Sequence, residues 1–180
     1  HCREVDLSWQ AFPDAMAYQI YISKSPKFDS IALKKLSKTP RIKVDLQMGN
    51  YFWKVRAIDK NKKPGFWSEP GRLIVKPYPP ELIDPKNQVE FEYFEVGPTI
   101  EFSWKPVEGK PVYEIFIYKT TGRKVLEDTT TEATYKTNKL QEGEYMWKMR
   151  TIYEGLYISE YCEPRRFLIE KKELNETKLI

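Results

Sequence analysis

Hydrophobic and polar residues alternate along short stretches of this chain and do not recur at helical spacing. In "YQIYISK" (18–24) the residues Tyr18, Ile20 and Ile22 fall on one face, and "YEIFIYK" (113–119) repeats the pattern. Alternation with a period of two predicts half-buried strands. Turn sequences rich in Gly, Pro and Asp separate the stretches. Because no segment carries a helical stripe, we predict an all-β protein built as an antiparallel sandwich.

The same stretches occur twice, which indicates that a domain has been duplicated. "LSWQAFPDAMAYQIYISK" (7–24) aligns with "FSWKPVEGKPVYEIFIYK" (102–119) at an offset of 95 residues. "GNYFWKVR" (49–56) aligns with "GEYMWKMR" (143–150) at an offset of 94. We therefore expect two copies of one domain whose loops differ in length by a single residue.

A proline-rich segment, "KPYPP" (76–80), joins the two copies. Three prolines in five residues favour a stiff, extended crossing. We expect the first domain over 1–77, the second over 78–171 and a polar tail over 172–180. The tail carries an Asn-Glu-Thr acceptor pattern for N-glycosylation from Asn175, which has meaning only in a eukaryotic secretory context.

Both copies resemble fibronectin type III domains, and the resemblance covers nearly all of 1–171. It rests on Trp9 and Trp104 near the end of the second strand, on a Tyr-x-Ile-x-Ile third strand and on a Gly-x-Tyr-x-Trp-x-Val/Met-Arg sixth strand. "PPELIDPKN" (79–87) is similar to the first strand of type III-like modules in bacterial envelope proteins. The resemblance implies two tandem immunoglobulin-like antiparallel β-sandwiches from a bacterial, extracytoplasmic protein.

Two departures from the family pattern concern the first strand and the tyrosine corner. The first copy has no counterpart of 79–96, so we expect its first strand to be missing, disordered or supplied by something upstream. Tyr51 follows Leu46 by five residues, as Tyr145 follows Leu140, and the family usually has one residue more. A buried phenol needs a hydrogen-bond partner. We therefore still expect both hydroxyls to bond backward along the chain, with altered geometry.

The Trp-Lys-Arg cluster of the sixth strand, present once in each copy, divides between two faces. Alternation places Trp53 and Trp147 with the core-facing tyrosines, so we expect both rings to be buried. The lysine and the arginine that follow each tryptophan belong to the opposite face.

On that opposite face we predict a ladder of aromatic rings and arginines. The seventh strand should run beside the sixth, and it opens with Trp67 in the first copy and Tyr161 in the second. We expect Arg56 to stack on Trp67 and Arg150 to lie near Tyr161, since such a contact contributes about 0.5–2 kcal/mol. Cytokine-receptor type III domains have a similar ladder in their Trp-Ser motif. We interpret the ladder as a shield for the sheet; the alternative is a platform that binds a sugar or a protein.

A basic loop, "KNKKPGF" (60–66), leads to the seventh strand of the first copy. It ends on the aromatic Phe66, and type III domains often use this loop for recognition. Lys60, Lys62 and Lys63 would suit an anionic partner. The alternative is that these lysines only keep the loop soluble.

Composition argues against an enzyme. The only histidine is His1, and the chain has no catalytic Ser-His-Asp or Cys-His pattern, no metal-ligand spacing and no glycine-rich phosphate loop. We expect no metal and no cofactor. The net charge of +4 is too small to argue for nucleic acid, although 1–78 hold 15 basic and 7 acidic residues, a balance of +8. No apolar run approaches the roughly 18 residues of a membrane helix.

Cys2 and Cys162 are the two cysteines of the chain. The family topology places Cys2 before the second strand of the first copy and Cys162 at the start of the seventh strand of the second. Both positions could face the domain junction. An interdomain disulfide, two free thiols and pairing with residues outside this stretch are the three alternatives.

These observations together favour a non-catalytic interaction or spacer module of a larger extracytoplasmic protein, whether periplasmic, secreted or on the cell surface. Its partner would be another protein or the neighbouring domains of the same chain. Carbohydrate or peptidoglycan binding through exposed aromatics is one alternative function. Ligand binding at the interdomain elbow, as in receptor type III domains, is the other. The fold alone does not decide between them.

Overall fold

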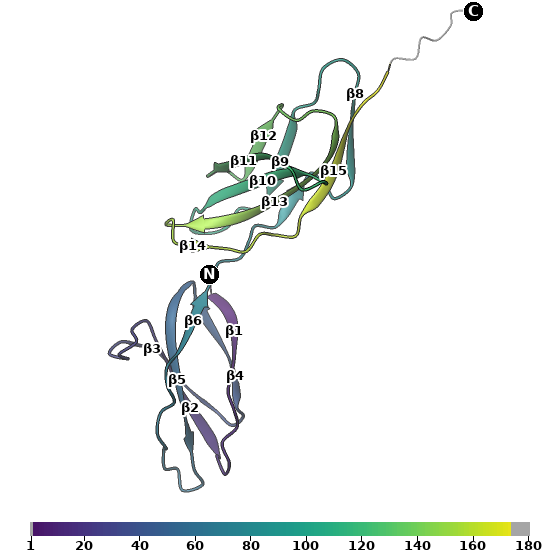
Figure 1. The fold of residues 1–180 in the computed structure, drawn as a ribbon. Helices are drawn as coiled ribbons and strands as arrows, with labels where there is room; N and C mark the ends of the chain where they lie inside the picture. The colour runs from purple at the N-terminus through teal and green to yellow at the C-terminus, as the bar shows by residue number, and fades with distance from the viewer. Residues whose placement is uncertain (1, 174–180) are drawn as a thin grey trace, which may run out of the picture. The chain divides into compact units, whose positions relative to one another are not determined.

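The computed structural model describes residues 2–173, which contain strands and no helix. Most of the expected polar tail, with the glycosylation pattern at Asn175, lies outside the described residues. The described chain forms two compact units, which divide between Lys76 and Pro77 (Figure 1). Nothing in residues 2–173 has the helical length and apolar character needed to cross a membrane.

Unit 1, the part before Pro77, is a sandwich of a two-stranded and a four-stranded antiparallel sheet. The order in the sheets is β1-β4 and β3-β2-β5-β6. Its strands are β1 (Cys2–Ser8), β2 (Ala17–Ser23), β3 (Ile31–Ser37), β4 (Arg41–Gln47), β5 (Gly49–Ile58) and β6 (Gly71–Val75).

Unit 2, from Pro77 onward, has the same two layers with more strands. The order in its sheets is β12-β9-β7 and β11-β10-β13-β15-β8, with β14 paired to β13. Its strands are β7 (Leu82–Asp84), β8 (Val89–Tyr93), β9 (Ile100–Trp104), β10 (Val112–Lys119), β11 (Lys124–Thr130), β12 (Thr134–Thr137), β13 (Gly143–Tyr153), β14 (Tyr157–Ile158) and β15 (Arg165–Lys171). The all-β prediction is confirmed.

The strand registers show that the duplication extends to hydrogen-bond pairing. Tyr51 of β5 pairs with Leu73 of β6, and Tyr145 of β13 pairs with Phe167 of β15, at the same offset of 94. Unit 2 alone carries the edge strand β7 beside β9 and the parallel strand β8 beside β15. Within residues 2–173, no strand pairs with the corresponding outer edges of β1 and β6. The source of the first strand of the first copy stays a prediction.

Burial was predicted for Trp53 and Trp147, and the structure buries only one of them completely. Trp147 is fully buried, with its ring 4.9 Å from that of Phe102, as expected. Trp53 is only half-buried, so the expectation of its burial is wrong. Strand β8 pairs with β15 from Phe167 onward, whereas within residues 2–173 no strand pairs with the outer edge of β6. The Trp53 indole instead lies over Gly71, where an added Cβ would be 2.5 Å from its Nε1.

Both tyrosine corners form as predicted. The Tyr51 hydroxyl donates to the Gln47 carbonyl oxygen at 3.1 Å, and the Tyr145 hydroxyl donates to the Gln141 carbonyl oxygen at 2.7 Å. Each phenol therefore meets the backbone four residues earlier, which ties β5 and β13 to the turns that precede them.

Candidate functional site

The ladder of unit 1 forms as predicted on the outer face of β5. The guanidinium carbon of Arg56 lies 4.4 Å from the centre of the Trp67 ring, and Lys54 Nζ lies 4.9 Å from it. The Tyr21 ring, from the neighbouring strand, is 4.6 Å from Trp67. Trp67 is therefore half-buried, and its ring is already engaged by a tyrosine and two cations of its own unit.

The ladder of unit 2 repeats this arrangement with an added carboxylate. Arg150 lies 4.8 Å from the centre of the half-buried Tyr161 ring, and Lys148 Nζ lies 4.1 Å from it. Arg150 and the Tyr161 hydroxyl both donate to Glu114 Oε2. Partial burial opposes ionisation of Glu114, but these hydrogen bonds outweigh it and hold the Glu114 pKa below its ordinary value. The pKa of Tyr161 is raised, first by burial and then by its bond to Glu114.

Unit 1 replaces that carboxylate by an amide. Gln19 occupies the place of Glu114, and its Oε1 accepts from Arg56 Nε at 2.8 Å. Gln19 pairs with Arg56 across β2 and β5, just as Glu114 pairs with Arg150 across β10 and β13. The two ladders thus share geometry, while an ion pair is present only in the second.

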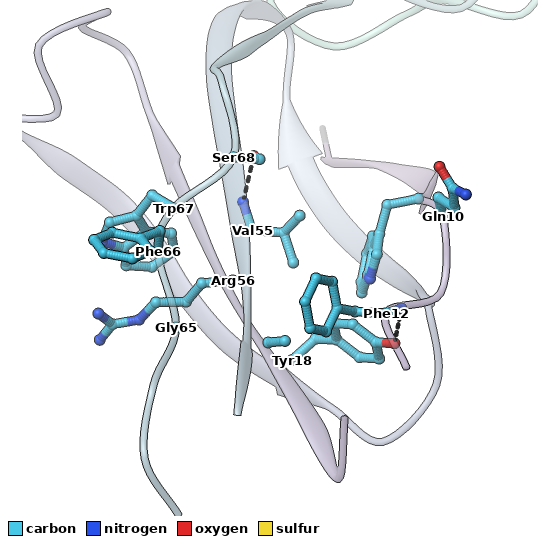
Figure 2. A pocket seen from close by; sticks show the side chains of 11 residues that line it. Gln10, Phe12, Tyr18, Val55, Arg56, Gly65, Phe66, Trp67 and Ser68 are labelled. Atoms are coloured by element: carbon cyan, nitrogen blue, oxygen red, sulfur yellow. Dashed lines mark hydrogen bonds between the residues drawn. The ribbon is translucent and has the colours of Figure 1, made fainter. Parts of the chain in front are cut away.

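An apolar pocket of about 470 Å³ opens in unit 1, beside the ladder (Figure 2). Its walls come from the connection between β1 and β2, from β5, and from the segment that leads to β6. In Figure 2, Phe12 and Tyr18 lie on one side of Val55, and Phe66 and Trp67 lie on the other. Phe12 is 67% exposed and Phe66 is fully exposed, so two phenyl rings border the opening without being part of the core.

Backbone hydrogen bonds fix both sides of this pocket. The Phe12 N–H donates to the Tyr18 hydroxyl at 3.0 Å, which holds the β1–β2 connection against β2. The Val55 N–H donates to Ser68 Oγ at 3.1 Å, which anchors the segment carrying Phe66. Both bonds are drawn in Figure 2. Both walls are therefore tied to the strands of unit 1 by hydrogen bonds.

The basic loop is an ordered turn next to this pocket. Asp59 Oδ1 accepts the backbone N–H groups of Asn61 and Lys63, at 2.9 and 2.8 Å. Lys62 takes a positive φ of 63° at the tip. Lys60, Lys62 and Lys63 are exposed, and Lys63 lines a second hollow that shares Phe12 and Gly65 with the pocket. The structure thus brings the loop lysines close to Phe66, while Arg150 and Tyr161 belong to the other unit.

Both cysteines are free thiols in the structure; Cys2 is exposed and Cys162 is half-buried. Cys162 Sγ accepts the Met149 N–H at 3.2 Å, which repeats the bond between Ser68 and Val55 in unit 1. Burial raises the pKa of the Cys162 thiol. Cys162 therefore has a structural role of its own, and the interdomain disulfide stays a prediction.

Sequence analysis missed the pocket and its residue Phe12. One signal lay in "FPDA", where an aromatic residue opens a turn that would otherwise be polar. A second lay in the comparison of the copies: Ala57 and Gly65, which line the pocket, stand where unit 2 has Thr151 and Ser159. No cluster of three or more His, Cys, Asp or Glu side chains that could hold a metal occurs in residues 2–173.

Comparison with known proteins finds likeness at the level of structure. No family model and no curated protein matches the sequence. A two-domain fibronectin type III segment of chicken tenascin superimposes with a TM-score of 0.54 at 13% identity, over 92% of this chain and 91% of that one. Fibronectin(III)-like modules of Clostridium thermocellum CbhA match over 94% and 86% of the two chains, at 14% identity and a TM-score of 0.37.

Three consecutive domains of chicken CNTN1 also match, at 14% identity and a TM-score of 0.38, over 94% of this chain and 62% of that one. At such identities the likeness concerns the fold. The chain therefore has the fold of two tandem fibronectin type III domains.

Proposed function

We propose that this chain is a non-catalytic interaction module of a larger extracytoplasmic protein and that the pocket of unit 1 binds a protein partner. The observation that carries the proposal is the pair of exposed phenyl rings, Phe12 and Phe66, at the mouth of a preformed apolar pocket. Aromatic side chains that project from an ordered backbone are the usual anchors of protein interfaces.

Charge supports a polypeptide partner with acidic groups. Residues 1–78 carry a balance of +8, and Lys60, Lys62 and Lys63 lie on the loop beside the pocket. Arg56 adds a further cation along the wall. The positive electrostatic potential of these side chains increases the association rate with an acidic partner, and contacts in the apolar pocket slow its dissociation.

Selection of peptides from a random display library on the full chain tests this function. Peptides that bind the pocket should lose at least about tenfold in affinity when Phe66 is replaced by alanine. Truncation of an interface anchor costs about 2 kcal/mol of binding free energy. The melting temperature should not change, because Phe66 is fully exposed. Phe94→Ala is the matched control, since Phe94 is an exposed phenylalanine of unit 2. Peptides that respond equally to both substitutions would refute the proposal.

A second candidate function is carbohydrate binding, which the exposed ring of Phe66 favours. Trp67 and Tyr161 are poorer platforms, because each ring already contacts cations of its own unit. The stacking surface for a sugar would therefore be Phe66 with Phe12. Two results would favour carbohydrate binding over protein binding. The chain would bind glycans on an array and lose this binding on Phe66→Ala, and the display library would yield no enriched peptide.

A further inference from the structure

The four-stranded sheet of unit 1 contains basic residues and no acidic ones. None of its strands, β2, β3, β5 and β6, includes an Asp or a Glu. Its basic residues are Lys34, Lys35, Lys54, Arg56 and Arg72. The acidic strand residues of unit 1 are Glu4, Asp6 and Asp45, and all of them belong to the β1-β4 sheet. Charge in the strands of unit 1 is therefore separated between the two sheets.

Strand register allows this sheet to be compared with that of unit 2 row by row. In unit 2, Glu127 of β11 and Lys148 of β13 pair with the same phenylalanine of β10. In the corresponding row of unit 1, Lys34 of β3 and Lys54 of β5 pair with Tyr21 of β2. The carboxylate at one end of the row in unit 2 is thus a second ammonium group in unit 1.

The next row shows a change in the same direction. The Glu114 carboxylate accepts from Arg150 in unit 2, whereas the Gln19 amide accepts from Arg56 in unit 1. The two rows of unit 2 hold two carboxylates and two cations, and those of unit 1 hold three cations and no carboxylate. Both rows run over β3, β2 and β5, so neither depends on what pairs with the outer edges of β1 and β6.

Aromatic rings lie against the three cations of these rows. Lys54 Nζ is 4.2 Å from the centre of the Phe28 ring, and Lys34 Nζ is 5.0 Å from that of Tyr21. Arg56 lies over the ladder tryptophan. Within residues 2–173, none of the three cations forms an ion pair. A ring holds a cation in position without neutralising it, so all three charges can act on an anion outside the protein.

The guanidinium of Arg56 makes one hydrogen bond to the described residues. Its Nε donates to Gln19 Oε1 at 2.8 Å, and the two terminal nitrogens donate to no group of residues 2–173. In Figure 2 the guanidinium extends away from Val55, on the side of Phe66 and Trp67. A planar guanidinium binds a carboxylate through two parallel hydrogen bonds. The chemistry of this face therefore favours a carboxylate ligand.

We propose that the outer face formed by Lys34, Lys54 and Arg56, the cationic face, binds an acidic polypeptide segment with carboxylates at alternating positions. Lys54 and Arg56 are two residues apart on β5, so their side chains leave the sheet about 6.8 Å apart. An extended polypeptide repeats the side chains of one side at the same spacing. The contact goes beyond the pocket of the proposed function, with which it shares Arg56, and its test does not need the pocket.

An exposed leucine on the cationic face favours a polypeptide over an anionic polysaccharide. Leu36 pairs with Gln19, which pairs with Arg56, so the three side chains lie in one row. The Leu36 side chain is 65% exposed. A chain of uronic acids offers carboxylates but no apolar side chain to cover this leucine, whereas a polypeptide offers both. We therefore expect the acidic segment to carry one apolar residue among its carboxylates.

A synthetic peptide with glutamate at every other position and one leucine tests the proposal on the full chain. Calorimetric titration should show binding that weakens as the ionic strength rises, because the contact is electrostatic. The NMR signals of Arg56 Nε–H and Trp67 Nε1–H should shift saturably. The same peptide with glutamine in place of each glutamate should not bind.

Lys34→Glu tests the position of the contact. This variant gives the row the charge that Glu127 provides in unit 2, and it should weaken peptide binding about tenfold. Lys35→Glu is the matched control, because Lys35 is the next residue of β3, is exposed and points to the other face. It changes the net charge equally and, at about 0.15 M salt, should alter the affinity by no more than about twofold.

Gln19→Glu should act in opposite directions on stability and on binding. The new carboxylate would pair with Arg56 as Glu114 pairs with Arg150, so the melting temperature should rise by roughly 2–5 °C. The peptide should bind about tenfold more weakly, because this carboxylate competes for the guanidinium. A variant that is more stable and yet binds less separates loss of the contact from loss of the fold, and it decides the matter if Lys34→Glu fails to fold.

Several results would overturn the inference. One is the lack of binding with excess peptide; another is an equal loss of affinity in Lys34→Glu and Lys35→Glu. Binding of an oligouronate but not of the peptide would make an anionic polysaccharide the ligand. If display-selected peptides need Phe66 while the acidic peptide does not bind, the proposed function stands and this inference fails. If the acidic peptide needs Lys34 while no selected peptide needs Phe66, the inference stands and the pocket proposal fails.

Discussion

Arg150 donates its Nε–H to Glu114 across neighbouring strands of unit 2, and the Glu114 side chain is only 12% exposed. Gln19 replaces this carboxylate in unit 1. The ladders are therefore alike in shape, but only the second is expected to depend on pH in the acid range.

Glu114→Gln tests that pH dependence. The pKa of Glu114 is lower in the folded state than in the unfolded state. Ionised Glu114 therefore stabilises the fold at pH values above its unfolded-state pKa of about 4.3. This stabilisation is lost as the pH falls towards the folded-state pKa. At pH 7 the variant should lose about 1–3 kcal/mol of unfolding free energy. The difference from the natural chain should shrink below pH 4 in urea titrations. A constant difference from pH 7 to pH 3 would contradict this account.

Trp147→Ala and Trp53→Ala should differ in cost although the two residues are equivalent in the repeat. Trp147 is fully buried, and its truncation should remove about 3–5 kcal/mol. Trp53 is half-buried at an open edge, so its truncation should cost roughly half as much. Thermal unfolding of the two variants measures the difference. Equal losses would mean that Trp53 is as well covered as Trp147.

Arg165→Met should loosen the segment around β7 of unit 2. Arg165 donates to three backbone carbonyl oxygens, and bonds from a charged donor contribute about 1.5–3 kcal/mol each. Hydrogen exchange of the Leu82 and Asp84 amides should accelerate by at least tenfold. Arg166→Met is the matched control, because Arg166 forms an exposed ion pair with Glu144 that contributes at most about 1 kcal/mol. Similar exchange rates in the two variants would show that the hydrogen bonds of Arg165 do not hold this segment in place.

Alkylation without reductant distinguishes the states of the cysteines. Cys2 is exposed and should react promptly with iodoacetamide. Cys162 should react slowly, because it is half-buried and burial raises its thiol pKa. Two thiols labelled before reduction in the mass spectrum would exclude the interdomain disulfide. Cys162→Ser should fold normally, since Ser68 forms the same bond to the backbone in unit 1.

Period-two alternation and the internal repeat predicted the sandwiches, whereas the tyrosine corners and the ladders were implied by the resemblance to fibronectin type III domains. Each of these depends on residues that lie close together along the chain, as Arg56 of β5 and Trp67 of the connection to β6 do. The partial exposure of Trp53 could not be predicted in this way, because alternation gives the face on which a side chain lies and not how completely it is covered there.

The pocket escaped prediction for a similar reason. It is lined by the β1–β2 connection, by β5 and by the segment before β6, which lie far apart in the sequence. The sequence marked the place only indirectly, through Ala57 and Gly65 at positions where the second copy has polar residues. Because the chain contains two copies of one fold, aligning them reveals the positions at which one copy has lost polar side chains.

The open edge of β1 has a consequence for solubility. An unpaired strand edge is a site at which chains aggregate, and natural proteins protect such edges with charges. On β1, Glu4 pairs with Lys43 and Asp6 pairs with Arg41, at 2.8 and 3.0 Å, and both pairs are exposed. These exposed charges disfavour association of unit 1 with the strands of other chains.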